Sequence, residues 1–349
     1  MIKINNWLKT FYAMTKISYS GNNEKYFVNF ITDYLKKDNI SQQKDDHDNI
    51  IVKIDGKGAP LVLVVNVDTQ VEQKIVIKRK GNIVKTDGKS TLGLDRVNIT
   101  TVLEILKYLK SSMIKNRPIE AVFVNDSFEH GSLSDLDYAK IKAREAICLY
   151  PGKPVGTMVK TTPFVYSVDI EIVCPQDNGV NALFIAAQAL SNLKLGKINK
   201  DLFINMNGIV IEGPKDAIPH RVKLTGEIRA ISSVQALSQL DQINKAFKKF
   251  VRRQKAKLVF KSRLASKGKI INTKDDFWKL IATSAKKADL ELNIISSCDR
   301  SNIGVLSNHK INAVQIGCGG KHTGTNKEMI RTSEISDLAK LIILVARNV

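Results

Sequence analysis

The order of apolar and polar positions divides the chain into buried strands and amphipathic helices. Residues 61–65 are a continuous apolar run rich in β-branched side chains, which predicts a strand buried on both faces of a sheet. Similar runs at 119–124 and 146–150 predict two more central strands, and residues 97–110 carry apolar side chains along one helical face. Strands that alternate with helices in this way indicate an α/β domain.

The middle of the chain follows a different order. We expect a strand at 164–174, a helix at 178–193, strands near 202–212 and 220–231, a helix at 233–254 and a strand at 256–263. This is the βαββαβ order of a ferredoxin-like domain. The α/β pattern returns with a helix at 275–288 and continues to a last helix from residue 333. We therefore predict an α/β domain at 1–157 and 265–349, with an inserted βαββαβ domain at 158–264.

Polar side chains follow the strand that begins at residue 61. Asn66 and Asp68 are two positions apart, so strand alternation places both side chains on the same side. The second central strand also has a polar exit, at residues 125–131. Because α/β sheets carry their sites at the carboxyl ends of their strands, the sequence predicts a site at this edge.

Composition argues against a membrane protein, a secreted protein and a disulfide-rich protein. No apolar run approaches the ~18 residues that a membrane-spanning helix needs, and the first residues lack the apolar core of a signal peptide. The four cysteines show no C-x-x-C spacing, which favours reduced thiols over disulfides or a structural zinc site. We expect a cytoplasmic protein with no membrane partner.

Positive charge is concentrated in one region of the chain. The net charge is +20, and residues 245–269 contain eleven Lys or Arg and no Asp or Glu. Five of these cations lie on the outer face of the predicted helix at 233–254 and are called here the basic stripe: Lys245, Lys248, Lys249, Arg252 and Arg253. The stripe is either a solvated helix face or a binding surface for an unknown acidic protein or complex. Nucleic acid is a less favoured partner, because this face carries no aromatic side chains for base stacking.

Several phrases of the sequence resemble one enzyme family. They are Asn66-Val67-Asp68-Thr69, the loop at 86–95, Pro154-Val155-Gly156-Thr157, Gly226-Glu227-Ile228-Arg229 and Ser301-Asn302-Ile303. In order and spacing they resemble the zinc-dependent exopeptidases of the peptidase T (tripeptide aminopeptidase) and aminoacylase family, from about residue 11 to the end of the chain. The resemblance implies an α/β/α catalytic-type domain with an inserted βαββαβ lid domain. It also implies a homodimer formed through the lid.

The family's metal ligands are largely replaced in this chain. Family members hold two zinc ions with two histidines and three carboxylates, and another glutamate activates the bridging water. The resemblance places five residues at degenerate positions: Asn66 and Gly324 at the histidines, Arg96 and Tyr150 at two of the carboxylates, and Phe128 at the activating glutamate. The residual candidates for metal binding are Asp68, Asp95, Glu129 and His322.

Two positions have open interpretations. Arg96 either replaces the metals as a cation that pairs with Asp68 or Glu129, or it points to solvent at the start of a helix. Arg229 matches a family position near the substrate carboxylate, but a strand arginine in a structural ion pair fits equally well.

We therefore expect a catalytically inactive homologue of a di-zinc aminopeptidase that serves as a binding or assembly scaffold and needs no cofactor. The first alternative is an active metallopeptidase that hydrolyses small peptides with a reduced zinc site. The second is a basic component that binds nucleic acid or an acidic protein complex.

Overall fold

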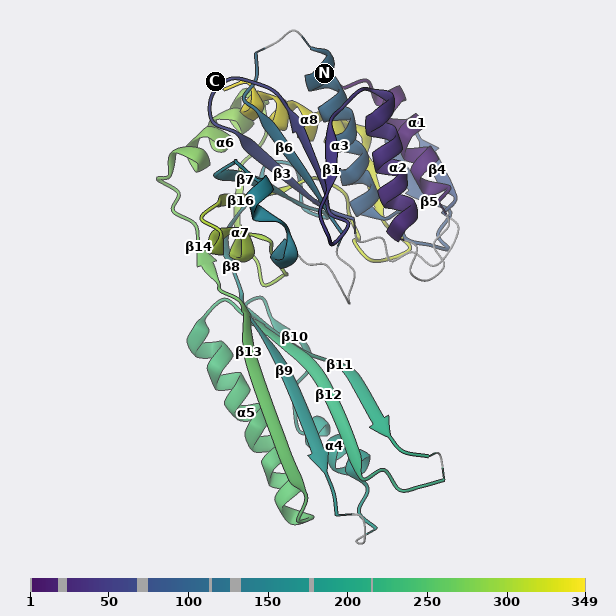
Figure 1. Cartoon of the computed structure of the whole chain (residues 1–349), viewed down its shortest axis with the longest axis vertical. Helices are drawn as coiled ribbons and strands as arrows, with labels where there is room; N and C mark the ends of the chain where they lie inside the picture. The colour runs from purple at the N-terminus through teal and green to yellow at the C-terminus, as the bar shows by residue number, and fades with distance from the viewer. Residues whose placement is uncertain are drawn as a thin grey trace. The chain divides into compact units, whose positions relative to one another are not determined.

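Two units, each built around its own sheet, make up the chain (Figure 1). The first comprises residues 1–159, 272–295 and 305–349, and the second comprises residues 160–271 and 296–304. The computed structural model describes residues 2–17, 24–67, 75–112, 115–125, 133–175, 179–214 and 216–348. Whether the boundaries predicted above delimit independently folding domains stays a prediction.

A mixed sheet of nine strands forms the centre of the first unit, and its strands β8 and β14 include residues assigned to the second. Its order is β1-β2-β6-β3-β7-β16-β8-β14, and β15 also pairs with β8. The central strands β6, β3, β7 and β16 run parallel, whereas β1, β2, β8 and β14 pair in antiparallel fashion. The strands are β1 (Gln42–Lys44), β2 (Ile50–Ile54), β3 (Leu61–Asn66), β6 (Ile119–Val124), β7 (Glu145–Tyr150), β8 (Thr157–Thr162), β14 (Lys269–Ile270), β15 (Asn293–Ser296) and β16 (Asn312–Gly317).

Helices cover this sheet because their apolar faces are buried against it and against each other. The longest, α3, packs on β2 and β3 and also contacts α1, α2 and α8. At the α1–α3 contact, the indole of Trp7 donates to the hydroxyl of Thr101 at 3.0 Å, so this buried polar pair is satisfied. The helices are α1 (Ile4–Thr15), α2 (Glu24–Lys37), α3 (Leu94–Ser111), α6 (Asp276–Lys287), α7 (Ile303–Asn308) and α8 (Thr332–Ala346).

A small antiparallel sheet completes the first unit, in the order β17-β5-β4. Its strands are β4 (Ile77–Lys80), β5 (Ile83–Thr86) and β17 (Met329–Arg331). Val84 and Ile330 are buried in a cluster with Trp7 and Phe11 of α1. β4 and β5 form a hairpin, and Gly81 in its turn has φ of 59°.

Five antiparallel strands and two helices form the second unit. The strand order β10-β11-β12-β9-β13 contains the ferredoxin-like arrangement and adds β10 at one edge. This fifth strand, β10, was not predicted from the sequence. The elements are β9 (Phe164–Val173), α4 (Ala182–Ser191), β10 (Gly196–Asn199), β11 (Leu202–Glu212), β12 (Arg221–Ala230), α5 (Ser233–Arg253) and β13 (Lys257–Ser266).

Both helices of the second unit begin at side-chain caps. The side chain of Asn181 accepts from the amides of Leu183 and Phe184, and Ser232 accepts from the amide of Gln235. Each helix then buries its apolar face against one side of the sheet, where Phe247 is completely buried. The predicted fold class, an α/β domain with an inserted βαββαβ-type unit, is confirmed.

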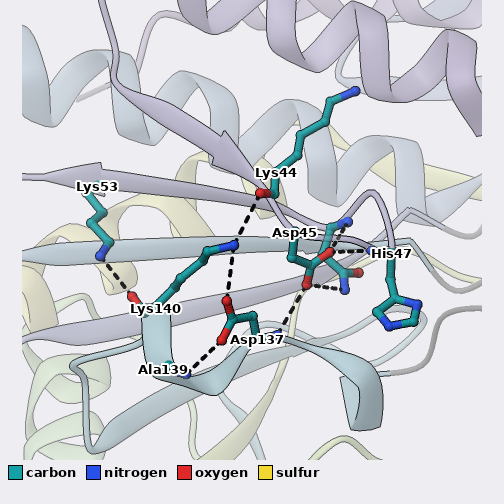
Figure 2. Close-up of polar contacts among 8 residues, drawn as sticks. Lys44, Asp45, His47, Lys53, Asp137, Ala139 and Lys140 are labelled. Carbon is teal, nitrogen blue, oxygen red and sulfur yellow. Dashed lines mark hydrogen bonds and ion pairs between the residues drawn. The ribbon is translucent and has the colours of Figure 1, made fainter.

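Polar contacts hold a loop against the edge of the large sheet (Figure 2). Asp45 accepts from the amide and side chain of Asn49, both at 2.9 Å, and from the amide of Asp137 at 3.3 Å. Lys140 pairs with Asp137 at 3.1 Å, and Lys53 donates to the carbonyl of Lys140 at 2.8 Å. These bonds tie residues 137–140 to β2 and to the turn before it.

No helix in the described part of the chain is long and apolar enough to cross a membrane. All four cysteines are buried free thiols, in agreement with the expectation of reduced cysteines.

Candidate functional site

The predicted site lies where the parallel strands β6, β3, β7 and β16 end. β3 is paired with β6 on one side and β7 on the other, so Asn66, Asn125 and Tyr150 follow or end neighbouring strands at the same edge. Three residues that the sequence places at this site lie outside the described residues: Asp68, Phe128 and Glu129. His130, which follows Glu129 in the chain, lies outside them as well. The described part of the site includes Tyr150, Cys318, Arg96 and Glu328.

Tyr150 is a packed residue at the end of β7. It is buried, and its carbonyl accepts from the amide of Cys318 at 3.1 Å. The ammonium of Lys153 lies 5.5 Å from the centre of its ring. At the position where the resemblance places a carboxylate ligand, the chain thus has an aromatic side chain in contact with a cation.

Cys318, at the end of β16, is not an activated nucleophile. Its side chain is buried, and burial raises the pKa of the thiol far above its usual range; the nearby charge of Asp95 also raises it, whereas a hydrogen bond with Asn98 lowers it. His322 is exposed and adopts a left-handed backbone conformation with φ of 59°. The thiol would therefore remain protonated, so a cysteine–histidine nucleophile at this loop has no support.

Arg96 is the most unusual residue at this edge. It lies in the first turn of α3 and is only 1% exposed, so the interpretation in which it points to solvent is wrong. The cause is the packing of α3, which is covered by neighbouring elements along most of its length. The guanidinium carbon lies 4.7 Å from the centre of the Phe27 ring. A cation–π contact of this kind offsets part of the cost of burying the charge.

Within the described residues, the charge of Arg96 has few polar partners. Its Nε and Nη1 atoms have no hydrogen-bond partner among the described residues. Burial lowers the pKa of the guanidinium to about 10, which still leaves it protonated at neutral pH. A positive charge therefore stands where the resemblance places a metal-bridging carboxylate. Pairing with Asp68 or Glu129 stays a prediction, because both residues lie outside the described part.

A buried carboxylate, Glu328, joins the two loops that the resemblance associates with metal ligands. One of its oxygens accepts from the amide of Gly93 at 2.8 Å, and the other accepts from the amide of Gly324 at 2.6 Å. Glu328 is 3% exposed, and burial raises its pKa although these hydrogen bonds oppose the shift. Gly324 has φ of 76°, so its left-handed backbone suits glycine. Sequence reasoning missed Glu328.

Arg229, in the second unit, forms an ion pair within its own strand. Its Nε lies 2.9 Å from Glu227 Oε1, although the two groups are not aligned as a hydrogen bond. The guanidinium stacks 4.0 Å above the ring of Phe203. The second oxygen of Glu227 accepts from Arg300 Nε at 3.0 Å. This geometry favours the structural interpretation of Arg229, and it identifies Phe203 and Arg300 as neighbours that the sequence did not reveal.

The basic stripe is exposed along α5, as predicted. Lys245 pairs with Asp241 at 2.6 Å, and the described residues provide no acidic partner for the other four cations. Lys249 and Arg253 lie 5.6 Å and 5.5 Å from the centre of the Phe250 ring. The stripe is thus a solvated surface with an excess of positive charge.

Comparisons with known proteins identify the fold. No family model matches the chain. The protein YqjE of Bacillus subtilis, itself uncharacterized, is 21% identical over 272 residues, which are 75% of this chain and 73% of YqjE. The structure of aminopeptidase PepT from Bacillus cereus has a TM-score of 0.79 and 18% identity, covering 99% of this chain and 98% of PepT. A tripeptidase from Staphylococcus aureus has a TM-score of 0.82 and 20% identity, with the same coverage.

A Bacillus subtilis structure described as a dinuclear metal-binding peptidase of the M20 family has a TM-score of 0.67 and 12% identity, covering 98% of this chain and 97% of that one. The chain therefore shares the fold of peptidase T and the M20 peptidases. The resemblance seen in the sequence is confirmed at the level of the fold.

The described residues do not fit a pair of metal ions. They contain no group of three or more His, Cys, Asp or Glu side chains that could hold a metal. At the positions matched to family ligands stand an amide, a guanidinium, a phenol and a glycine, and a zinc pair needs imidazoles and carboxylates instead. Asp95 lies near the buried Cys318, and His322 belongs to an exposed loop.

Proposed function

We propose that this chain is a peptidase-fold protein that has lost two-zinc hydrolysis and serves as a binding or assembly scaffold. The observation that carries the proposal is the burial of Arg96 at the position matched to the bridging carboxylate. At a separation of about 4 Å and an effective dielectric constant of about 20, a dication and this guanidinium would repel each other by about 8 kcal/mol. A site that keeps Arg96 charged therefore disfavours metals beside it.

The second candidate is an active peptidase with a reduced metal site. It is supported by the comparisons, since the similar structures are named aminopeptidase, tripeptidase and metal-binding peptidase. In this candidate Asp68, Asp95, Glu129 or His322 would hold one zinc ion, which would polarise a peptide carbonyl or activate a water. The burial of Arg96 and the exposure of His322 weigh against it.

Metal analysis combined with a peptidase assay separates the two candidates. The full chain is purified without a metal-affinity tag, its zinc content is measured, and a panel of tripeptides is assayed with and without added zinc. The scaffold proposal predicts substoichiometric zinc and no turnover above the buffer. Stoichiometric zinc together with turnover that a chelator abolishes would contradict it and support the second candidate.

A matched variant sharpens this assay. Arg96→Asp restores a carboxylate at the matched position, and Arg96→Leu removes the charge without supplying a ligand. If Arg96 excludes metal, both variants should bind zinc more tightly than the parent chain, and the Asp variant should bind it most tightly. Equal zinc affinity in all three chains would show that Arg96 has no influence on metal binding.

The remaining expectations about the scaffold are proposals as well. We propose a cytoplasmic location, which the four unpaired thiols support. We also propose an acidic macromolecule as the partner of the basic stripe, and the charge excess along α5 supports this. A homodimer formed through the second unit rests on the resemblance alone.

A further inference from the structure

A cleft of the first unit lies against its small sheet and the loop at 321–328. The cleft measures about 380 Å³ and is lined by side chains from β4, β5 and that loop. Four basic side chains contribute to its lining: Lys78, Lys85, His322 and Lys327. We call it the lysine cleft. The cleft shares His322 and Glu328 with the region described above, but its three lysines have no role in the proposed function.

The register of the small sheet places two lysines side by side. Lys78 of β4 is directly opposite Lys85 of β5, and Lys85 is in turn opposite Met329 of β17. The alternate positions of the same strands carry Val84 and Ile330, which are buried in the core. The lysines therefore project from the outer face of the sheet. Like charges directly opposite each other destabilise an antiparallel pair, so this arrangement has an energetic cost in the free protein.

The basic side chains that line the cleft outnumber the acidic ones. None of the four basic side chains takes part in an ion pair in the described part of the chain. Two acidic residues also line the cleft, Asp87 and Glu328. Asp87 accepts from the amide of Lys89 at 3.1 Å, and the buried Glu328 uses its oxygens on the amides of Gly93 and Gly324. The cleft keeps an excess of positive charge.

We infer that the lysine cleft binds a phosphate group of a small anionic ligand. Lysine ammonium groups act as compact point charges with three donors each, which suits the dense charge of a phosphate. An anion between Lys78 and Lys85 would turn their mutual repulsion into two attractions. The volume lies within the range of small-ligand sites. This inference does not depend on whether the strand-end site hydrolyses peptides.

Calorimetric titration of the full chain with pyrophosphate tests the inference. Sodium chloride at matched ionic strength serves as the buffer control, and citrate serves as a carboxylate probe of similar charge. Pyrophosphate should bind with a Kd of about 1 mM or lower. Lys78→Gln and Lys85→Gln should each weaken binding about tenfold, because each removes a charge beside the ligand.

Lys80→Gln is the matched control. Lys80 lies two positions from Lys78 on the same strand, is exposed, and does not line the cleft. Its replacement changes the net charge by the same amount, and we expect less than a twofold change in affinity. If the Lys80 variant loses as much affinity as the cleft variants, binding follows the diffuse charge of the protein and the proposed site is refuted.

Two further results would also overturn the inference. One is the absence of pyrophosphate binding to the parent chain at about 10 mM ligand, and the other is citrate binding as tight as pyrophosphate binding.

Two controls show whether weaker binding by a variant results from loss of its fold. The Tm of Lys85→Gln should not fall, because repulsion with Lys78 is relieved. Lys327→Gln, on the loop rather than the sheet, should weaken pyrophosphate binding as well.

Discussion

Replacing Arg96 with methionine should stabilise the protein. Methionine is unbranched, apolar and shorter than arginine, so the change removes a buried cation from the core and keeps the packing of the inner part of the side chain. Burial lowers the pKa of the guanidinium to about 10 in the folded chain, and the difference from its ordinary value corresponds to a cost of about 3 kcal/mol for keeping the charge there. The lost contact with the Phe27 ring offsets this by about 1 kcal/mol. The expected net gain is about 2 kcal/mol.

The sign of the pH dependence follows from proton binding. Above about pH 10 the folded chain releases the Arg96 proton while the unfolded chain still holds it, so the stability of the parent chain rises with pH there. Below pH 10 both states are protonated and the full cost is present. The advantage of Arg96→Met should therefore be constant from pH 6 to pH 9.

Urea unfolding at pH 7, followed by far-ultraviolet circular dichroism, measures the difference. Arg96→Lys is the matched control, because it keeps a cation and should show no gain. A loss of about 3 kcal/mol or more in the methionine variant would refute the reasoning. Such a loss is the signature of a buried ion pair broken on one side, and it would show that Asp68 or Glu129 pairs with Arg96.

Two other predictions concern the basic stripe and Glu328. Reversing the charge of four stripe residues to Glu should abolish salt-sensitive co-purification of acidic partners; an unchanged set of partners would leave the stripe as a solvated face. The four residues are Lys248, Lys249, Arg252 and Arg253. Glu328→Ala should lower the unfolding free energy by about 2–3 kcal/mol in urea, because the amides of Gly93 and Gly324 lose their acceptor. Glu328→Gln, which keeps one acceptor oxygen, should cost less, and an equal cost in both variants would contradict this explanation.

The sequence predicts most of the architecture because hydrophobic periodicity is strong in this chain. The strand at 61–65 and the helix at 97–110 correspond to β3 and α3, and the order of the ferredoxin-like elements is confirmed. The missed strand, β10, spans only Gly196–Asn199 and contains a glycine, a lysine and an asparagine. Its strand conformation depends on pairing with β11, which local sequence does not reveal.

The site was harder to predict than the fold, because the burial of Arg96 and the hydrogen bonds of Glu328 depend on residues far apart in the sequence. Sequence alone leaves burial and exposure of Arg96 equally open, because either one depends on what covers the start of α3. Its burial results from the covering of α3 by neighbouring helices. Glu328 lies 235 residues from Gly93, and no pattern in the sequence links a carboxylate to a backbone amide at that distance. The loops that carry Asp68 and Glu129 lie outside the described residues, so their part in the site stays a prediction.

Glu328 links two loops of the strand-end region through backbone amides. In a metal site, ligands on different loops are held together by the ion that they share. Here the loop before α3 and the loop before β17 are joined by one buried carboxylate that accepts two backbone amides. The link depends on the two carboxylate oxygens of Glu328 and on the backbone amide of Gly324. It does not require the histidine side chain that the resemblance places at position 324. The link between these two loops is therefore made by protein groups alone, which supports the scaffold proposal.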